Sequence, residues 1–180
     1  NVISIVDYSS GSLPPLPSET DLDSPSSWAV ANIKEADSVG LIPDNLEGAY
    51  KTNITRQEFC NLAMKLITIN LGEEAVTKML NASGISYSDA RAAFTDAYHI
   101  DIINCYRLDI IGGKGNGIFD PNGSLTRQEA AKILTNICKI LNITPSVVQA
   151  PTCDDRDKIA VWAEEYVDFI CRAGIMSGKG

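Results

Sequence analysis

The 180-residue sequence has no run of about 20 apolar residues, which is the length that a membrane-spanning helix needs. Its first residues also lack the charged start and the apolar stretch of a signal peptide. The 15 basic residues form no run that could follow a phosphate backbone, and 23 acidic residues leave a net charge of -8. We therefore expect neither a membrane span nor nucleic-acid binding.

Histidine and closely paired cysteines are scarce as well. The only histidine, His99, has no cysteine on its helical face, because Cys105 lies six residues further on. The five cysteines form no Cys-x-x-Cys pair, which excludes zinc-ribbon and thioredoxin-like motifs. We interpret them as small buried hydrophobic residues, with one disulfide and an odd thiol as the alternative. The sequence nominates no catalytic pair and no cofactor.

What the sequence does contain is helical spacing of apolar residues, which make up 44% of the chain. A helix is predicted from Trp28 to Val39, capped by Ser26 or Ser27, and another from Glu73 to Ser83, closed by Gly84. Three further apolar stripes indicate helices around residues 59–67, 130–141 and 162–173. Strand-like alternation is almost absent, so the predicted fold class is all-α. Residues 1–27, with four prolines among many serines, are typical of a linker.

Short motifs recur along the chain in a fixed order. Ile54-Thr55-Arg56-Gln57-Glu58 returns 71 positions later as Leu125-Thr126-Arg127-Gln128-Glu129. Val39-Gly40-Leu41-Ile42 returns as Leu108-Asp109-Ile110-Ile111 and as Ala173-Gly174-Ile175-Met176. Trp28 and Trp162 each stand 12 residues before one of these glycines. The repeat unit is a helix, a turn, a loop, Thr-Arg-Gln-Glu and a second helix, present twice in full and once by half, and such units must pack on one another.

This unit resembles the S-layer homology repeat of bacterial surface proteins. The second copy carries the fullest set of motifs: Phe94-Thr95-Asp96, Ile110-Ile111-Gly112-Gly113, Gly117-Ile118-Phe119-Asp120-Pro121 and Leu125-Thr126-Arg127-Gln128-Glu129. The copies also depart from the family pattern. The second has Ala97 where the others have tryptophan, the first replaces the glycine loop by residues 43–50, and the third lacks Thr-Arg-x-Glu.

The resemblance implies helix-loop-helix repeats packed as a pseudo-threefold bundle with the third repeat truncated. We expect repeat 1 with an extra helix at 28–84, repeat 2 at 85–150 and the first half of repeat 3 at 151–180, within a longer protein. The implied function is non-catalytic anchoring of a secreted protein at the bacterial cell wall. The implied partner is an anionic secondary cell-wall polysaccharide on peptidoglycan, which in this family often carries a pyruvate ketal, bound in grooves between repeats.

The Thr-Arg-x-Glu motifs combine a structural and a functional prediction. Thr55 with Glu58, and Thr126 with Glu129, have the spacing of capping boxes. Arg56 and Arg127 place a cation at a helix start, where the helix dipole disfavours it. We interpret both arginines as receptors for a sugar carboxylate, aided by bare backbone N–H groups. The alternative is an ion pair between neighbouring repeats.

The sequence evidence for ligand binding is weaker at the other candidate residues. Trp28 and Trp162 could stack on sugar rings, although we favour them as core anchors between helices. Gly112 and Gly113, with Lys114, belong to a loop that permits close ligand approach, and a tight interhelix connection explains the glycines equally well.

Three alternative functions remain at this stage. Asp120, Asn122 and Ser124 match the first positions of a calcium loop, but Leu125 and Ala131 break the frame, so no metal site is predicted. A protein-interaction or surface-layer assembly module, including self-association, would be favoured by exposed apolar surface at the truncated end. An enzyme would need a deep pocket around His99 with converging carboxylates.

Overall fold

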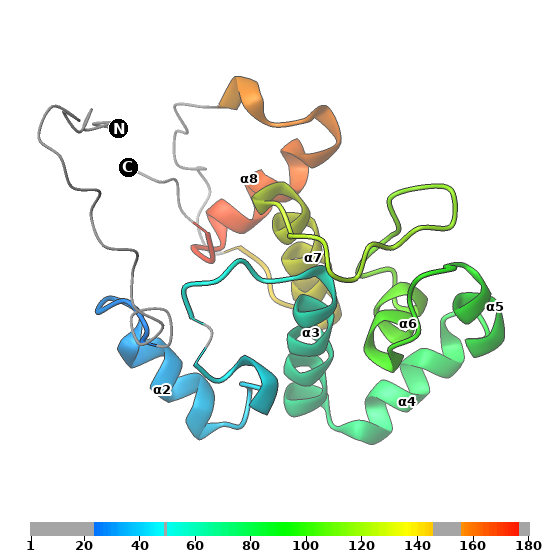
Figure 1. Cartoon of the computed structure of the whole chain (residues 1–180), viewed down its shortest axis with the longest axis horizontal. Coiled ribbons are helices and arrows are strands. Elements are labelled where there is room, and N and C mark those ends of the chain that lie inside the picture. The colour runs from blue at the N-terminus through cyan, green and yellow to red at the C-terminus, as the bar shows by residue number, and fades with distance from the viewer. Residues whose placement is uncertain (1–23, 49, 146–155, 177–180) are drawn as a thin grey trace, which may run out of the picture.

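The computed structural model describes residues 24–48, 50–145 and 156–176, which form helices and connecting turns (Figure 1). Within these ranges there is no strand, only two isolated bridges. The all-α prediction is confirmed, while the pseudo-threefold packing and the repeat boundaries stay predictions. The α-helices are α2 (Val30–Ser38), α3 (Arg56–Leu71), α4 (Glu73–Ala82), α5 (Tyr87–Ala92), α6 (Ile100–Arg107), α7 (Arg127–Ile140) and α8 (Glu164–Arg172). Three short 3-10 helices are η1 (Asp44–Leu46), η2 (Arg156–Lys158) and η3 (Val161–Ala163).

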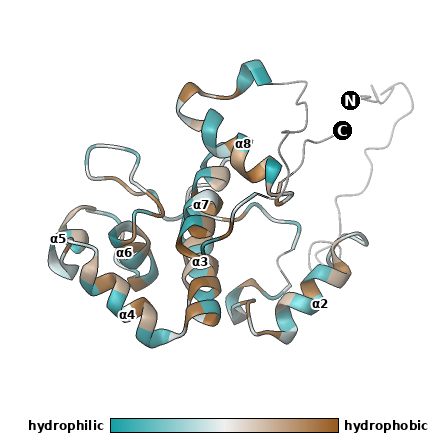
Figure 2. Cartoon of the chain, turned by 180° about the vertical axis from the view of Figure 1, so that it is seen from behind, coloured by the Kyte–Doolittle hydropathy of each residue, from teal (hydrophilic) through white to brown (hydrophobic). Residues whose placement is uncertain are grey.

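The long second helices of the first two repeats, α3 and α7, lie at the centre of the molecule (Figure 1). α6 packs against α3, and α8 packs against α7. Figure 2 shows hydrophobic residues gathered along α3 and α7. The main core joins Ile67 of α3, Ile102 of α6 and Ile137 of α7 with Phe94 and Phe119 from the loops. α2 lies on the other side of α3 from α6, and none of its residues is buried.

The recurring turn adopts the same backbone geometry after three first helices. Gly40, Asp109 and Gly174 have φ values of 68°, 54° and 70°, the left-handed region that ends many helices. The next residue closes each turn: the N–H groups of Leu41, Ile110 and Ile175 donate to the carbonyls of Ala36, Cys105 and Ile170. The pattern that recurs in sequence therefore recurs as a structural motif.

The starts of the first helices differ from the prediction. α2 begins at Val30, its N-cap is Ala29, and no side chain caps it. The residues before it form a turn instead, in which the Ala29 N–H donates to the Ser26 carbonyl at 2.8 Å. Trp162 likewise lies in η3, and α8 begins only at Glu164. Most of the predicted linker, residues 1–23, and the final 177–180 lie outside the described residues.

Other predictions of local structure are confirmed. α4 ends at Ala82, just before Gly84, whose φ is 77°. Cys60, Cys105 and Cys138 are buried free thiols, whereas Cys171 is partly buried and Cys153 lies outside the described residues. Helix α5 was not predicted, although Ser86 and Asp89 offer a start signal: the Ser86 hydroxyl accepts from the Asp89 N–H.

Candidate functional site

Arg56 is the organising residue of the site. Only 2% of it is exposed, and three acceptors surround its guanidinium. Nε donates to the Phe119 carbonyl at 2.8 Å, Nη2 to the Gly112 carbonyl at 2.7 Å, and Nη1 pairs with Glu129 Oε1 at 2.7 Å. The guanidinium also lies 4.6 Å from the centre of the Phe119 ring. Arg56 thus joins α3 of repeat 1 to the turn and the second helix of repeat 2.

The backbone N–H groups at the N-terminus of α3 are already hydrogen-bonded within the chain. Thr55 and Glu58 form a capping box, as Thr126 and Glu129 do at α7. The N–H groups of Arg56 and Gln57 donate to the carbonyls of Gly123 and Pro121, each at 3.0 Å. The expectation of bare N–H groups ready for an anion is therefore wrong at α3.

The loop that supplies Phe119 is fixed by Asp96 of the Phe94-Thr95-Asp96 motif. The N–H groups of Phe119 and Asp120 donate to the two carboxylate oxygens of Asp96, each at 2.8 Å. The hydrogen bond from Phe119 is the largest cause that holds the pKa of Asp96 below its ordinary value. An ionised Asp96 therefore keeps the carbonyl of Phe119 in place against Arg56.

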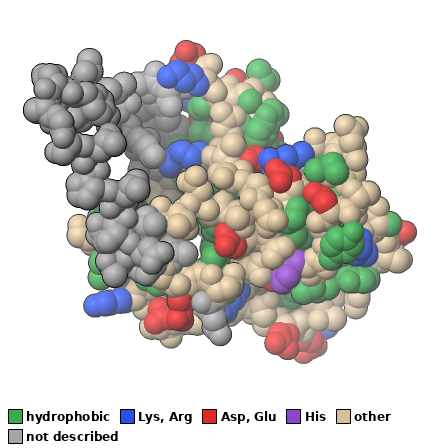
Figure 3. Space-filling model, viewed as in Figure 1, with side chains coloured by type: hydrophobic (Ala, Val, Ile, Leu, Met, Phe, Trp, Pro, Cys, Tyr) green, Lys and Arg blue, Asp and Glu red, His purple; other side chains and the backbone are tan. Residues whose placement is uncertain are grey.

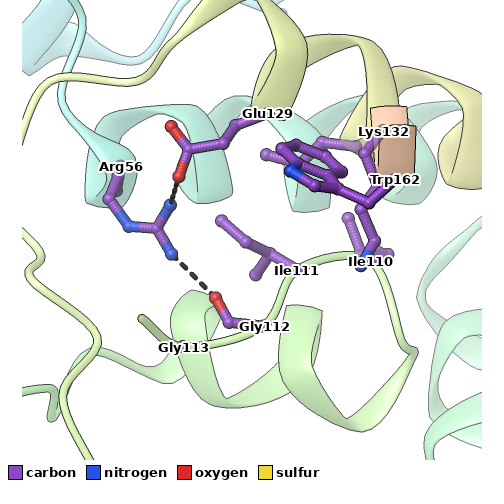
Figure 4. Close-up of a pocket in the computed structure, with 9 residues that line it drawn as sticks. Arg56, Ile110, Ile111, Gly112, Gly113, Glu129, Lys132 and Trp162 are labelled. Atoms are coloured by element: carbon purple, nitrogen blue, oxygen red, sulfur yellow. Dashed lines mark hydrogen bonds and ion pairs between the residues drawn. The ribbon is translucent and has the colours of Figure 1, made fainter. Parts of the chain in front are cut away.

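A pocket of about 220 Å³ opens beside the Arg56 to Glu129 pair (Figure 4). We call it the junction pocket, because residues of all three predicted repeats line it. The predicted repeat 1 supplies Arg56, and the predicted repeat 3 supplies Trp162. Repeat 2 supplies the rest of the lining, namely Ile110, Ile111, Gly112, Gly113, Glu129, Lys132 and Ile133.

The junction pocket has a surplus positive charge. Arg56 and Glu129 neutralise each other, but Lys132 has no carboxylate partner among the residues that the structure describes. Its ammonium lies 5.8 Å from the centre of the Tyr166 ring, and Lys132 and Trp162 both line the pocket (Figure 4). The pocket therefore combines one cation available to a ligand, one exposed aromatic ring and an apolar floor.

The charge on Glu129 depends on its hydrogen bonds. Partial burial acts to raise the pKa of Glu129, but hydrogen bonds from the Thr126 N–H and hydroxyl, together with the Arg56 charge, outweigh it. The net pKa is lower than that of an ordinary glutamate, so the ion pair persists into mildly acidic conditions.

The structure separates the seven residues nominated for ligand binding. Arg56, Trp162, Gly112 and Gly113 meet in the junction pocket. Lys114 lies outside it and pairs with Asp120 at 3.0 Å, and Arg127 is exposed elsewhere at the start of α7. Lys132 was not among the predicted site residues, although its spacing of three from Glu129 places both on one face of α7.

The preferred interpretation of the tryptophans as core anchors is wrong. Trp28 is 81% exposed and Trp162 is 50% exposed. Each precedes its α-helix instead of lying within it, so neither ring is carried into the helix interface. Trp28 lines a second, largely apolar pocket of about 460 Å³ with Ile33, Leu41 and Leu62, which we call the α2 pocket.

The histidine, the possible metal ligands and the possible membrane-spanning helices were also checked against the structure. His99 is the N-cap of α6, where its Nδ1 accepts from the Asp101 N–H, as expected for a capping histidine. In residues 24–48, 50–145 and 156–176, no three potential ligands group to hold a metal ion. Over the same ranges, no helix combines the length and apolar character needed to cross a membrane.

Comparison with known proteins gives the family context. Residues 86–131 match the family model of the S-layer homology domain. Exoglucanase XynX of Acetivibrio thermocellus is 27% identical over 155 residues, which cover 84% of this chain and 13% of that protein. S-layer protein sap of Bacillus anthracis is 24% identical over 158 residues, which cover 85% of this chain and 17% of that protein.

A third relative is the amylopullulanase of Thermoanaerobacterium thermosulfurigenes, 30% identical over 110 residues, or 59% of this chain and 6% of that protein. The chain therefore spans less than a fifth of the length of each of these relatives. No solved structure matches the chain.

Proposed function

Starting from the S-layer homology domain that this chain carries, we propose that it anchors a cell-surface protein by binding an acidic wall polysaccharide in the junction pocket. S-layer homology domains are non-catalytic modules that attach proteins to the cell wall, and the similar proteins include an S-layer protein. These relationships support a location at the cell surface or cell wall. The glycan and its place of binding are our proposal.

The aromatic and apolar walls suit a sugar ring. Trp162 presents half of its surface to solvent at the mouth of the pocket, and Ile110, Ile111 and Ile133 line it. An indole face packs well against the C–H face of a pyranose, while its edge stays hydrated. A volume of about 220 Å³ accommodates a single sugar unit better than an oligosaccharide. One sugar unit of the polysaccharide would enter the junction pocket, and the adjoining sugar units would remain outside it.

Lys132 is the observation that carries the proposal. Lys132 lines the pocket and has no carboxylate partner among the described residues, so its ammonium can pair with a carboxylate such as that of a pyruvate ketal. Arg56 then acts as a positioning residue, because its donors already hold the Gly112 and Phe119 carbonyls and Glu129. Lys132 thereby takes the role that the sequence analysis gave to Arg56 and Arg127.

The general charge pattern agrees with a ligand of this kind and not with nucleic acid. Basic side chains are scattered over the face seen in Figure 3, among acidic ones, and form no continuous positive track. A single lysine in a pocket binds one acidic group, whereas phosphate backbones require a row of cations.

The test is co-sedimentation with purified cell-wall sacculi, before and after chemical removal of the secondary polymer. The chain should sediment with intact sacculi and stay in solution with stripped ones. Lys132→Gln should weaken binding by about tenfold, as expected for loss of one charge-assisted contact. Lys139→Gln is the matched control, because Lys139 lies on the same helix, 5.6 Å from the same Tyr166 ring, but outside the pocket lining.

Binding that survives removal of the polymer would contradict the polysaccharide proposal. A Lys132→Gln chain that is folded by circular dichroism, yet sediments as well as the Lys139→Gln control, would instead contradict the assignment of Lys132.

A further inference from the structure

Gln128 of α7 binds the backbone of the segment that leads to Trp162. Its side-chain nitrogen donates to the Lys158 carbonyl, and its side-chain oxygen accepts from the Ala160 N–H, each at 3.1 Å. A side-chain amide carries a donor and an acceptor on the same carbon, so one residue satisfies both backbone groups. Gln128 therefore joins the second helix of the predicted repeat 2 to the start of the predicted repeat 3.

Trp162 lies in a short turn that has no side-chain cap of its own. The turn is η3, its N-cap is Ala160, and the acceptor for the Ala160 N–H comes from Gln128. On the other side of Trp162, Ala163 is fully buried, and its N–H donates to the Ala160 carbonyl at 2.7 Å. Trp162 is thus held between a buried alanine and the hydrogen bonds of Gln128.

An ion pair also holds this segment, but within the predicted repeat 3. Arg156 pairs with Asp168 of α8 at 3.0 Å, and the Arg156 side chain is 53% exposed. Exposed ion pairs contribute little to stability, because water and salt screen them. Since both partners belong to the same predicted repeat, this pair does not tie the segment directly to α7. The two hydrogen bonds of Gln128 do.

The contact with α7 places the Trp162 indole relative to the cation of the junction pocket. Gln128 and Lys132 are four residues apart, so they lie on one face of α7, one turn from each other. Lys132 and Trp162 line the pocket, whereas Gln128 does not. A shift of residues 158–160 would therefore move the indole relative to the ammonium without changing the chemical groups that a ligand meets.

We propose that Gln128 is a positioning residue for glycan binding: by holding residues 158–160, it sets the separation of Trp162 and Lys132 that one acidic sugar unit must span. This inference rests on the proposed function, because it concerns the same pocket. The sugar ring has to lie against the indole while its carboxylate reaches the ammonium. An indole that is free to move would have to be ordered on binding, which lowers affinity.

A matched control comes from the first repeat, whose corresponding residues line the α2 pocket. Glu58 and Leu62 of α3 stand 71 positions before Glu129 and Ile133 of α7. The first two line the α2 pocket, and the last two line the junction pocket. The two pockets therefore lie at equivalent places in successive predicted repeats, and a residue beside one can be compared with its counterpart beside the other.

Gln57 of α3 is the counterpart of Gln128, again 71 positions earlier. The N–H that it would have to bind is that of Thr95, two residues before Ala97, which takes the place of the tryptophan. The Thr95 N–H donates instead to the Gly117 carbonyl at 2.9 Å. Gln57→Met therefore removes the same side chain from the first turn of a long helix without removing this contact.

The test uses the whole 180-residue chain with Trp28→Phe, so that Trp162 is its only tryptophan. Gln128→Met removes both hydrogen bonds but keeps an unbranched side chain of similar helix propensity. Trp162 emission should shift to longer wavelength, and acrylamide should quench it more strongly than in the parent. Gln57→Met should leave both signals unchanged. By calorimetry, polymer released from sacculi should bind Gln128→Met about three- to tenfold more weakly than Gln57→Met.

A second variant guards against loss of folding. Gln128→Glu keeps the acceptor for the Ala160 N–H and loses the donor to the Lys158 carbonyl. An acidic residue in the first turn of a helix is favoured by the helix dipole, so this chain should fold. Its Trp162 quenching should lie between that of the parent and that of Gln128→Met.

Two results would overturn the proposal. Equal quenching of Trp162 in Gln128→Met and Gln57→Met would exclude the positioning role, whether or not the polymer binds. Stronger quenching in Gln128→Met with equal affinity of both variants for the polymer would show that the indole position does not matter to the ligand. Failure of the parent chain to bind the polymer would contradict the proposed function, while the quenching comparison would separately establish or exclude the contact itself.

Discussion

The junction pocket and the α2 pocket occupy equivalent places in two repeats, but only the junction pocket has a buried arginine and a packed first helix. At the junction pocket, Arg56 binds the Glu129 carboxylate and the carbonyls of Gly112 and Phe119. Helix α8 packs against α7. The α2 pocket is also lined by apolar residues, but its glutamate, Glu58, forms no ion pair among the described residues, and α2 has no buried residue. In the described residues, an arginine from the preceding predicted repeat reaches the glutamate at the junction pocket, and no arginine lines the α2 pocket.

The largest difference is expected at the arginines themselves. Arg56→Ala should lower the free energy of unfolding by about 3–5 kcal/mol, because it leaves Glu129 and two carbonyls without their donor. Arg127→Ala, at the equivalent but exposed position, should cost no more than about 1 kcal/mol. Urea denaturation followed by circular dichroism measures both. Equal losses of unfolding free energy in the two variants would show that Arg56 and Arg127 contribute alike, which would contradict the difference described between the two repeats.

The first helices α2 and α8 should differ in how much their packing stabilises the chain. Ile170 of α8 is fully buried, so Ile170→Ala should cost about 2–5 kcal/mol. Ile33 of α2 is only partly buried, so Ile33→Ala should cost less than about 1 kcal/mol. Hydrogen exchange should accordingly be faster in α2 than in α8. Comparable protection of the two helices would mean that α2 is packed as well as α8.

A smaller contrast is expected at the glutamates. Glu129→Gln keeps the capping box but removes the partner charge of the buried Arg56, and should cost about 1–3 kcal/mol. Glu58→Gln removes a charge that no cation pairs with in the described chain, and should change stability by less than about 0.5 kcal/mol. The same denaturation series compares them. A large effect of Glu58→Gln would reveal a cation at the α2 pocket.

The smallest effect is expected with pH. The pKa of Glu129 is lower in the folded chain than in the unfolded chain, so its contribution to stability is present above the ordinary glutamate value. That contribution is lost as the pH falls from about 4 through the lowered pKa. In a Trp28→Phe chain, Trp162 emission should change over this range before global unfolding. The change in Trp162 emission should be absent when Glu129→Gln is added to this chain. An identical pH transition in that variant would contradict its assignment to the titration of Glu129.

Local motifs were the predictable part of this chain. The capping boxes, the three turns after the first helices and the end of α4 depend on residues that are neighbours in sequence, and the sequence analysis found them. The exposure of Trp28 and Trp162 was missed because it depends on where a helix begins, which differed by two residues from the prediction.

The candidate site was predictable only in part for a similar reason. Arg56 and Glu129 were both singled out, but their pairing joins residues 73 positions apart, and no local rule gives that distance. No local rule predicts either that Arg56 donates to the backbone carbonyls of Phe119 and Gly112. Because these hydrogen bonds use the guanidinium donors, we assign the ligand contact to Lys132. The motif identified the region of the site, and tertiary packing decided which cation faces the pocket.

The two tryptophans of the chain allow one experiment to locate the glycan, since Trp162 lines the junction pocket and Trp28 lines the α2 pocket. The measurement is fluorine NMR of 5-fluorotryptophan-labelled chain during titration with secondary polymer released from sacculi, with a Trp28→Phe chain to assign the two signals. We expect the Trp162 resonance to shift and saturate while the Trp28 resonance stays in place. A saturable shift of Trp28 with Trp162 unmoved would contradict binding at the junction pocket.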